Sequence, residues 1–387
     1  MYKVCFVTTA SITLKSFVLE LADAMHKTGS FEIHFICDND DEFKSLLPSY
    51  IHYHPVPMKR GISFDGIKVI GKLRRLFKQE KFDLVQYSTP NASCYASIAA
   101  RVAKIPVRLY CQWGIVYVGF TGLKRFIFKT IEKMVCRNST RIEPDSISNL
   151  NFSISEGLYT KEKGAVIWNG SACGVNLKKF DISKRDVFKA EIRQKYEIPQ
   201  DALVYIFVGR IGRDKGINEL LVAAEKMNEL KDDTYLLLVG ELENEQFLDK
   251  RLLNWSQNQK RVIYCGFTNE VEKYLAAADV YLLPSYREGF GTTVIEAESM
   301  GLATIVTDIP GPINAMLKNE TGLVVPKADA DALFKSMLYL YDNRDKIIKF
   351  AKCGAEFAAT SFEQEELFRQ IILDRENMLK SVSGTNG

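Results

Sequence analysis

The sequence predicts an α/β fold made of two doubly wound domains, in each of which helices cover both faces of a parallel β-sheet. The length of 387 residues suits two domains of about 150–200 residues each. Short apolar segments rich in β-branched residues alternate with segments of helical periodicity, first up to residue 170 and again from residue 201. The segment between them is rich in glycine, serine, asparagine and charged residues, which is typical of a linker.

The first series of elements occupies residues 1–170. Apolar runs predict strands at 3–9, 31–37, 84–88, 107–111, 141–143 and 166–168. Helical spacing predicts helices at 15–28, 66–80, 92–103, 122–138 and 146–156. Because strands and helices alternate with short connections, the sheet is expected to be parallel.

The second series occupies residues 201–360. Strands are expected at 204–208, 235–239, 262–265, 280–283, 304–307 and 323–325. Helices are expected at 216–230, 245–257, 269–278, 292–300 and 329–343. The linker is placed at 171–200, and residues 361–387 are expected to form a C-terminal helix that could cross back to the first domain. Two such domains facing each other would form a cleft at the carboxyl ends of their strands, where open α/β sheets bind ligands.

The composition excludes several classes of protein. Apolar residues make up 47% and charged residues 26% of the chain, so disorder, collagen and coiled coil are excluded as descriptions of the whole chain. No apolar run approaches the roughly 20 residues that span a bilayer, and charges at Lys15 and Glu20 interrupt any signal peptide. The eight cysteines form no C-x-x-C pair and several lie in apolar runs, which indicates buried thiols in a reducing compartment. With only four histidines, we expect no histidine-based metal site and no cofactor.

The charge is unevenly distributed along the chain. Residues 1–170 carry a formal net charge of +8 and the remaining residues carry −5. A basic first half suits an anionic partner, either nucleic acid or an anionic membrane surface.

Candidate site residues are densest in 279–311. The loop 288–292 contains two glycines and precedes a predicted helix, so its backbone N–H groups could approach a phosphate beside the positive end of the helix. Glu288 and Glu296 flank this loop and suit sugar hydroxyls, which donate hydrogen bonds to carboxylates. The alternatives are a dinucleotide fingerprint, whose third glycine is missing here, and a purely structural glycine turn.

The segment 288–296, E-G-F-G-T-T-V-I-E, resembles the E-x7-E signature of family-four retaining glycosyltransferases with the GT-B fold. Residues 207–210, F-V-G-R, followed by Lys215 and Gly216, resemble the G-R…K-G element of that family, although such residues could also form a solvated basic loop. The segments 119–137 and 168–181 resemble the narrower group of capsule and exopolysaccharide glycosyltransferases, which extend a repeat unit on a polyprenyl diphosphate lipid.

The resemblance implies specific roles. Glu288, Arg210 and Lys215 are the expected catalytic residues. Arg210 and Lys215 would contact the donor diphosphate, Glu288 the hydroxyls of the donor sugar and Glu296 the ribose. The expected donor-binding residues are Gly209, Arg210, Lys215, Gly240, Phe267, Glu288, Gly289, Phe290, Gly291, Thr292 and Glu296.

The family's mechanism implies retention by front-face displacement, in which the leaving diphosphate takes the proton and no nucleophile of the enzyme is needed. No metal is expected. The nearest approach to a D-x-D metal motif, residues 38–41, is interpreted as a helix cap.

The sequence departs from the family pattern on the acceptor side. Many members carry His-Gly where this chain has Trp113-Gly114, and the loop that contains Ser11 lacks the usual glycines. Residues 142–146 replace a V-S-x-S stretch. Trp113 and Ser11 are the acceptor-side candidates, and Trp113 could either stack on a sugar or simply fill the wall of the cleft.

The helix expected at 122–138 is a candidate membrane surface. Arg125, Lys129, Lys133 and Arg137 recur every fourth residue and therefore line one stripe of the helix, bordered by phenylalanine and isoleucine. This pattern favours an anionic headgroup surface. The alternative is a solvated helix face over buried apolar residues.

The resemblance implies a hexosyl- or N-acetylhexosaminyl-transferase of surface polysaccharide biosynthesis (capsule, exopolysaccharide or O-antigen). The expected partners are a nucleotide-diphosphate sugar, with UDP favoured, a polyprenyl-diphosphate-linked or saccharide acceptor, and an anionic membrane, but no nucleic acid. The expected location is the cytoplasm, peripheral at the inner face of the cell membrane. The alternatives are a nucleotide-sugar epimerase on the same fold and a non-catalytic relative that binds a nucleotide sugar or lipid.

Overall fold

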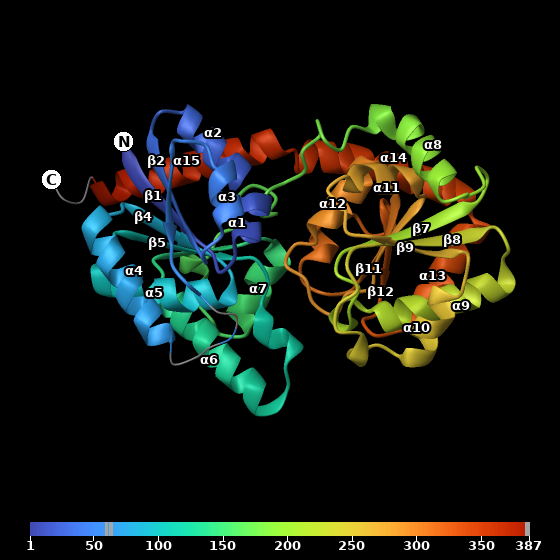
Figure 1. The fold of residues 1–387 in the computed structure, drawn as a ribbon, viewed down its shortest axis with the longest axis horizontal. Coiled ribbons are helices and arrows are strands. Elements are labelled where there is room, and N and C mark those ends of the chain that lie inside the picture. Colours follow the sequence, from blue (N-terminus) through green and yellow to red (C-terminus); the bar gives the residue numbers. More distant parts are fainter. Residues whose placement is uncertain (59–60, 62–64, 384–387) are drawn as a thin grey trace. The chain divides into compact units, whose positions relative to one another are not determined.

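The computed structural model describes residues 1–58, 61 and 65–383, and the chain divides into two compact units. Unit 1 comprises Met1–Cys173 and Glu365–Gly387, and unit 2 comprises Gly174–Gln364. Each unit contains a six-stranded sheet with helices on both faces (Figure 1). The predicted fold class, two doubly wound α/β domains, is confirmed.

The sheet of unit 1 is parallel and has the order β3-β2-β1-β4-β5-β6. Its strands are β1 (Tyr2–Val7), β2 (Phe31–Cys37), β3 (Ile51–Pro55), β4 (Leu84–Tyr87), β5 (Val107–Gln112) and β6 (Arg141–Pro144). The inner strand β1 is a continuous apolar run because both of its faces are covered, Val4 and Phe6 on one side and Cys5 and Val7 on the other.

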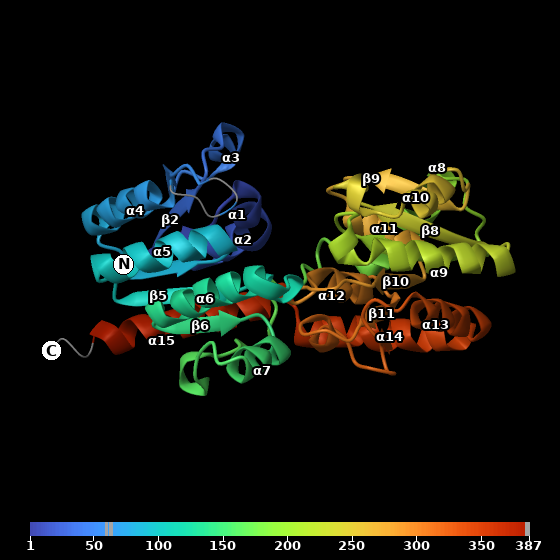
Figure 2. The same ribbon diagram turned by 90° about the horizontal axis from the view of Figure 1, so that it is seen from below.

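Two helical layers cover this sheet. The helices of unit 1 are α1 (Ser11–Phe17), α2 (Leu19–Lys27), α3 (Asp41–Leu46), α4 (Gly66–Glu80), α5 (Pro90–Ala103), α6 (Gly122–Asn138), α7 (Ile147–Ser155) and α15 (Gln364–Ser383). One face packs on α4, α5, α6 and α7, and the first three of these lie side by side (Figure 2). The other face packs on α1, α2, α3 and α15.

Unit 2 repeats this construction with the sheet order β12-β11-β10-β7-β8-β9. Its strands are β7 (Leu203–Val208), β8 (Thr234–Val239), β9 (Val262–Gly266), β10 (Val280–Leu283), β11 (Ala303–Thr307) and β12 (Gly322–Val325). Its helices are α8 (Arg185–Lys195), α9 (Ile217–Leu230), α10 (Lys250–Gln257), α11 (Val271–Ala277), α12 (Thr292–Ser299), α13 (Ala330–Asp342) and α14 (Arg344–Ser361). In Figure 1, α9, α10 and α13 lie on one side of the sheet and α8, α11, α12 and α14 on the other.

The C-terminal helix α15 belongs to unit 1, although unit 2 lies between it and the rest of that unit in the sequence. Its buried Arg375 donates to both carboxylate oxygens of Glu143 on β6, at 2.5 and 2.9 Å, and to Gln86 on β4. A buried guanidinium needs such partners, because an unpaired buried charge is strongly destabilising. Residues 384–387 of the expected C-terminal segment lie outside the described residues.

The structure differs from the expected elements in several places. The strand expected at 166–168 is wrong, because these residues form a loop in which Trp168 has a φ of +50°. Strand β3 and helix α14 were not predicted. The segment expected as a linker, 171–200, contains helix α8. The interpretation of Asp40 as a helix cap is confirmed, because its carboxylate accepts a hydrogen bond from the Phe43 N–H at the start of α3.

Candidate functional site

The residues expected to bind the donor follow four neighbouring strands of unit 2. Arg210 follows β7, Gly240 follows β8, Phe267 follows β9 and Glu288 follows β10. Strands β7 and β10 are adjacent, and the chain leaves β7 toward one edge of the sheet and later returns to form β10 on the other side. This is a topological switch point, where the carboxyl ends of open parallel sheets form ligand sites.

Lys215 and Glu288 meet at this switch point. The Lys215 ammonium lies 2.6 Å from Glu288 Oε1, and the Ser285 hydroxyl donates to the same oxygen at 2.7 Å. The two charged side chains are only 18% and 13% exposed. A charge-assisted hydrogen bond in so sheltered a place fixes both groups in one geometry.

Arg210 is held by two carboxylates on the more open side of this site. Its guanidinium donates to Glu243 at 2.8 Å and to Asp214 at 3.2 Å. Asp214 also accepts from Arg287 at 3.3 Å, so it bridges two arginines. Glu243 and Arg287 were not predicted, although Arg287 could have been noticed as a third cation beside Glu288.

Two glycines allow the close approach of these loops. Gly216 has a φ of +70°, and a Cβ there would lie 2.0 Å from the Pro284 carbonyl oxygen after β10. A Cβ on Gly240 would lie 2.0 Å from the carbonyl oxygen of Gly209. Any side chain at either position would push the strand ends apart, so glycine is required for the geometry of the site.

Glu296 lies on α12, in the second turn after the glycine loop. Burial raises its pKa to about 7, with nearby Lys179 lowering the pKa and Glu272 raising it. Glu288 and Glu296 both raise the pKa of Tyr281, whose pKa is raised mainly by burial. The two carboxylates of the E-x7-E motif therefore both lie close enough to act on one tyrosine of β10.

In the glycine loop before α12, residues 288–292, the side chain of Phe290 faces the interior. Phe290 is buried against Phe362, with ring centroids 5.1 Å apart, so only its main chain is available to a ligand. Gly291 forms the N-cap of α12 with a φ of +85°, and Thr292 begins the helix.

A pocket of about 680 Å³ lies at the carboxyl ends of β8 and β9. It is lined by Gly240, Glu241, Leu242, Gln257, Tyr264 and Gly266. The Tyr264 hydroxyl is hydrogen-bonded to Ser256 at 2.7 Å, which fixes the ring. Phe267, expected in this region, follows the lining residue Gly266 and has an exposed ring.

The acceptor-side candidates lie in unit 1, again after strands of a parallel sheet. Ser11 begins α1, and its hydroxyl donates to Asp40 at 2.5 Å. Trp113 directly follows β5 and is half-buried, with its ring 5.6 Å from that of Phe17. The Trp113 ring therefore packs on Phe17 with one part and is exposed with another, which is compatible with both of the roles expected for it.

Thr89 was not predicted and is unusual. It follows β4 beside the switch point between β1 and β4, with a φ of +67° that is rare for a β-branched residue. Its hydroxyl is 2.8 Å from the Thr9 hydroxyl, which also accepts from the N–H of Ala92 at 3.3 Å. Backbone strain of this kind marks functional loops.

A buried polar network supports the loop that carries Trp113. Glu132 of α6 accepts hydrogen bonds from Gln112 at 2.7 Å and from Tyr110 at 2.8 Å. The side-chain oxygen of Gln112, Oε1, accepts hydrogen bonds from the Ser153 hydroxyl at 2.9 Å and from the Tyr159 hydroxyl at 3.1 Å. Burial raises the pKa of Glu132. The network joins α6 to the end of β5.

Glu156 pairs with two of the four cations of the basic stripe on α6, a contact that the helical pattern of the sequence does not reveal. Arg125 and Lys129 both form ion pairs with Glu156, at 3.2 and 2.7 Å. Lys133 and Arg137 are exposed. Only part of the stripe therefore presents cations to solvent without a nearby carboxylate.

Two family models match the chain. The model described as glycosyl transferases group 1 matches residues 188–356, and the model described as glycosyl transferase 4-like matches residues 3–146. Together they span both series of strands and helices.

Individual proteins are similar over most of the chain. The capsular polysaccharide biosynthesis glycosyltransferase CapM of Staphylococcus aureus is 26% identical over 357 residues, which are 92% of each chain. The UDP-Gal:alpha-D-GlcNAc-diphosphoundecaprenol alpha-1,3-galactosyltransferase of Escherichia coli is 27% identical over 84% of this chain and 83% of its own. The crystal structure of Anabaena HepE in complex with UDP has a TM-score of 0.77 at 18% identity, covering 97% of this chain and 100% of HepE, which shows a shared fold.

Proposed function

We propose a reaction for this chain, which belongs to the group 1 glycosyltransferases with the GT-B fold and is of the capsule and exopolysaccharide type. It transfers a hexose or N-acetylhexosamine from a nucleoside diphosphate to a lipid-linked or saccharide acceptor, with retention of configuration. The observation that carries this proposal is the contact between Lys215 and Glu288 at the switch point of unit 2, with Arg210 beside it.

The charges at this site suit a sugar diphosphate. Lys215 pairs with Glu288, whereas the half-exposed Arg210 is shared between Asp214 and Glu243. A diphosphate brings further negative charge to the Lys215 ammonium and the Arg210 guanidinium, and the start of α12 adds the positive end of a helix dipole. Glu288 keeps a second carboxylate oxygen with which to accept from sugar hydroxyls.

The proposed mechanism uses positioning and electrostatics. The acceptor hydroxyl attacks the anomeric carbon from the side of the leaving group, and the departing diphosphate takes the proton from that hydroxyl. Lys215, Arg210 and the backbone N–H groups of 289–292 stabilise the charge that develops on the leaving phosphate. Glu288 holds the donor sugar, and Glu296 accepts from the ribose.

The favoured donor is a UDP-sugar. The pocket at the ends of β8 and β9 has room for a nucleobase beside the proposed diphosphate site. The Escherichia coli relative is named for a UDP-galactose donor, and HepE was crystallised with UDP. These names support the choice of nucleotide and leave the sugar open.

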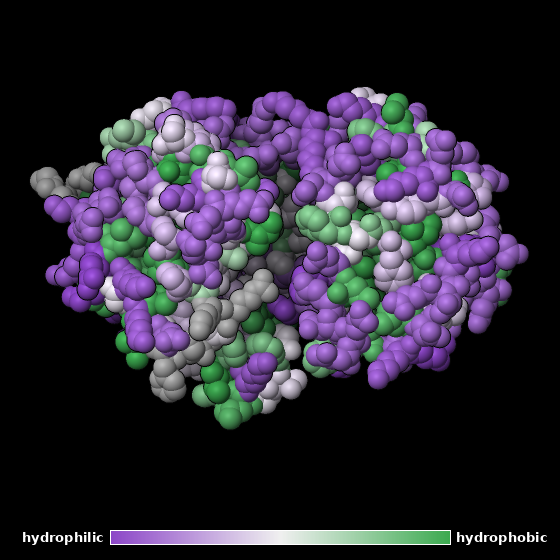
Figure 3. All heavy atoms as spheres, viewed as in Figure 1, coloured by the Kyte–Doolittle hydropathy of each residue, from purple (hydrophilic) through white to green (hydrophobic). Residues whose placement is uncertain are grey.

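The proposed acceptor is carried on a polyprenyl diphosphate lipid at the inner face of the cell membrane, and unit 1 docks there through the start of α6. Within the described residues, no helix combines the length and hydrophobicity needed to cross a bilayer. The start of α6 instead exposes Leu123, Phe126 and Ile127 next to Lys124. Figure 3 shows hydrophobic residues gathered where Figure 1 draws this part of unit 1. Exposed apolar side chains beside cations suit an anionic headgroup layer.

One incubation tests the proposed reaction. The chain is mixed with a panel of nucleotide sugars, with and without a polyprenyl-diphosphate-linked saccharide, and the products are separated by mass spectrometry. We expect a lengthened lipid-linked saccharide and free nucleoside diphosphate only when the acceptor is present. Conversion of the nucleotide sugar without an acceptor would instead indicate an epimerase, and the absence of any product across the panel would indicate a non-catalytic binder.

A further inference from the structure

Three histidines and a glutamate gather on one face of strands β2 and β3, in unit 1. Glu32 and His34 are two residues apart on β2 and therefore face the same side of the sheet. His52 of β3 is the register partner of His34, and His54 is the partner of Ile36. All three imidazoles thus project from the same face, close to the edge of the sheet.

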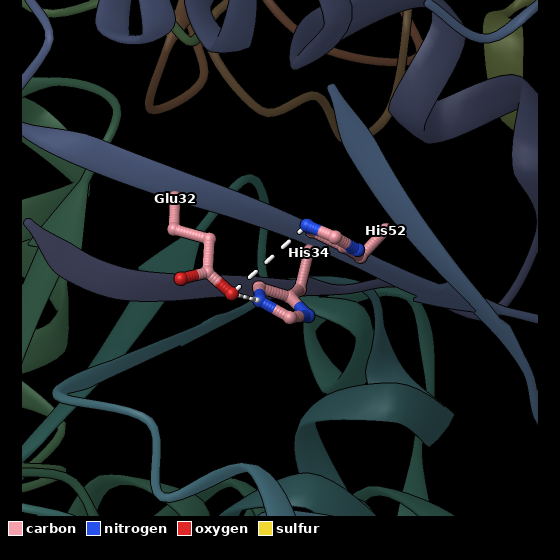
Figure 4. A group of neighbouring side chains, drawn as sticks. All are labelled: Glu32, His34 and His52. Atoms are coloured by element: carbon pink, nitrogen blue, oxygen red, sulfur yellow. Dashed lines mark hydrogen bonds and ion pairs between the residues drawn. The ribbon is translucent and has the colours of Figure 1, made fainter. Parts of the chain in front are cut away.

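The spacing of their ligand atoms suits a small metal ion. Glu32 Oε1 lies 2.9 Å from His34 Nε2 and 4.0 Å from His52 Nε2, and the ligand atoms of the three residues all lie within 4.8 Å of one another. Figure 4 shows the Glu32 carboxylate directed at both rings. In a tetrahedral site with bonds of about 2.0 Å, neighbouring ligand atoms are about 3.3 Å apart, a value between the two distances.

His54 supplies the support that a ligating histidine needs. His34 Nδ1 lies 3.0 Å from His54 Nε2, and the two rings are nearly parallel. Without a metal, Nε2 of His34 donates to the Glu32 carboxylate, which can only accept. A metal bound at Nε2 would require the proton to move to Nδ1, where His54 Nε2 lies within reach to accept a hydrogen bond from it. Metal-bound histidines usually donate their second ring N–H to a neighbouring acceptor, which fixes the tautomer and the orientation of the ring. Here the acceptor would be the His54 imidazole.

Lys3 is the cation that now faces this site. Its ammonium lies 3.2 Å from Glu32 Oε1 and 3.6 Å from Glu80 Oε2. Because Lys3 is partly exposed and already shared between two carboxylates, it can turn to Glu80 and leave Glu32 to an ion. In this structure the Lys3 ammonium therefore provides the positive charge beside Glu32 that a bound metal would provide instead.

We propose that Glu32, His34 and His52 bind a divalent transition ion of the zinc type, with His54 as the residue that orients His34. Two imidazoles and a carboxylate match the preferences of zinc, whereas magnesium and calcium prefer oxygen ligands alone. A water would fill the fourth position, on the side where His52 is exposed. The ion joins β3 to β2 at the edge of the sheet, and its function is structural and separate from the donor site of unit 2.

Zinc titration of the full chain tests this proposal. After treatment with EDTA and removal of the chelator, zinc is added in a calorimeter, and we expect one ion per chain. His52→Gln and Glu32→Gln each remove one ligand and are expected to weaken binding by about tenfold or more. Both side chains are partly exposed, so these variants should fold. His26→Gln is the matched control, since this fourth histidine stacks on Tyr50 outside the cluster and should leave zinc binding unchanged.

Two further measurements separate a built site from loose surface binding. Cobalt bound to the wild type should give the visible absorption of a tetrahedral ion, and His52→Gln should lose it. Lys3→Met should tighten zinc binding, because the competing cation is gone. The proposal is overturned if the wild type binds no zinc, or if folded His52→Gln and Glu32→Gln variants bind it as tightly as His26→Gln does.

Discussion

At the scale of single residues, the proposed donor site depends on the hydrogen bond between Lys215 and Glu288. The pair is sheltered and short, so each side chain holds the other in place before any ligand arrives. The two residues have different tasks in the proposed reaction, because Lys215 meets phosphate and Glu288 meets sugar. Variants of the two residues should therefore separate nucleotide binding from sugar transfer.

Replacing Glu288 by Gln should damage transfer without weakening the binding of UDP. The amide cannot provide the charged acceptor for the sugar hydroxyls, so kcat/KM should fall at least about tenfold, ~1.4 kcal/mol. UDP has no sugar in this position, and Lys215 loses a competing anion, so UDP affinity measured by calorimetry should be equal or higher. A parallel fall in UDP affinity and in turnover would contradict the division of tasks.

Glu296 should make stability depend on pH. Its ordinary pKa is 4.5 and its pKa in the folded chain is about 7, so between these values the unfolded chain releases a proton that the folded chain retains. Stability therefore falls as pH rises through this interval, and the loss is complete above about pH 7. The Glu296→Gln variant lacks this dependence. Its free energy of unfolding relative to wild type should rise by up to about 3 kcal/mol from about pH 4 to about pH 8.

Urea unfolding of both proteins at several pH values measures this difference, and Glu225→Gln is a control with a carboxylate whose pKa is lowered instead. A constant difference between wild type and Glu296→Gln over the whole range would show that the pKa of Glu296 is not raised by folding.

At the scale of elements, helix α6 combines two roles. Its inner face carries Glu132, which holds Gln112 and so the loop of Trp113. Its outer face begins with exposed apolar side chains, and two of its cations are occupied by Glu156. The proposed membrane surface should therefore be centred on the start of the helix and not on its whole basic stripe.

The double variant Leu123→Asp/Phe126→Asp should abolish binding to vesicles that contain anionic lipids. Both side chains are exposed, at 74% and 69%, so the fold should not depend on them. Flotation of vesicles measures the binding, which should also decline as salt rises because the headgroup attraction is screened. Ile348→Asp, on an equally exposed isoleucine of α14, is the matched control. If the double variant floats as well as this control, α6 is not the membrane surface.

Much of the element pattern could be predicted, and the failures have physical causes. The inner strands β7, β8, β10 and β11 of unit 2 are continuous apolar runs because both of their faces are buried, and the sequence therefore predicts them. Strand β3 alternates histidine with other residues at the edge of its sheet, and therefore lacks the apolar signal of a buried strand. The apolar residues at 166–168 resemble a strand, but they pack as a loop.

Contacts between distant residues were the least predictable part of the sites. The motifs identified Glu288 and Lys215 separately, yet their hydrogen bond spans a sequence separation of 73 residues and depends on β7 and β10 being neighbours. Glu156 neutralises Arg125 across 31 residues, so the helical stripe alone overstated the free cations. The zinc-type cluster was also hidden, because it forms only when β2 and β3 pair in register.

At the scale of the whole molecule, two sheets of the same design carry different chemistry. Each has a switch point between its first and fourth strands, β1 with β4 in unit 1 and β7 with β10 in unit 2. Unit 2 places cations and carboxylates at its switch point, whereas unit 1 places a strained threonine and hydroxyl groups there. This division suits a donor site in unit 2 and an acceptor site in unit 1.

Turnover should not require a divalent metal. Lys215, Arg210 and the start of α12 already oppose the charge of the diphosphate. The wild type should keep its activity after exhaustive treatment with EDTA, even where loss of zinc from the β2–β3 cluster lowers its melting temperature. The melting temperature of the His52→Gln variant should be the same with and without EDTA. A complete loss of activity that Mn²⁺ restores would count against the proposed donor site.

The proposed role of Lys215 and Arg210 in holding the donor diphosphate is tested most directly by titrating UDP into Lys215→Met and Arg210→Met in a calorimeter. We predict that each variant binds UDP at least about tenfold more weakly than wild type, a loss of ~1.4 kcal/mol or more. Lys226→Met, which breaks a surface ion pair with Asp331 in the same unit, should bind like wild type. If Lys215→Met and Arg210→Met remain folded and bind UDP as tightly as Lys226→Met, the donor site has been wrongly assigned.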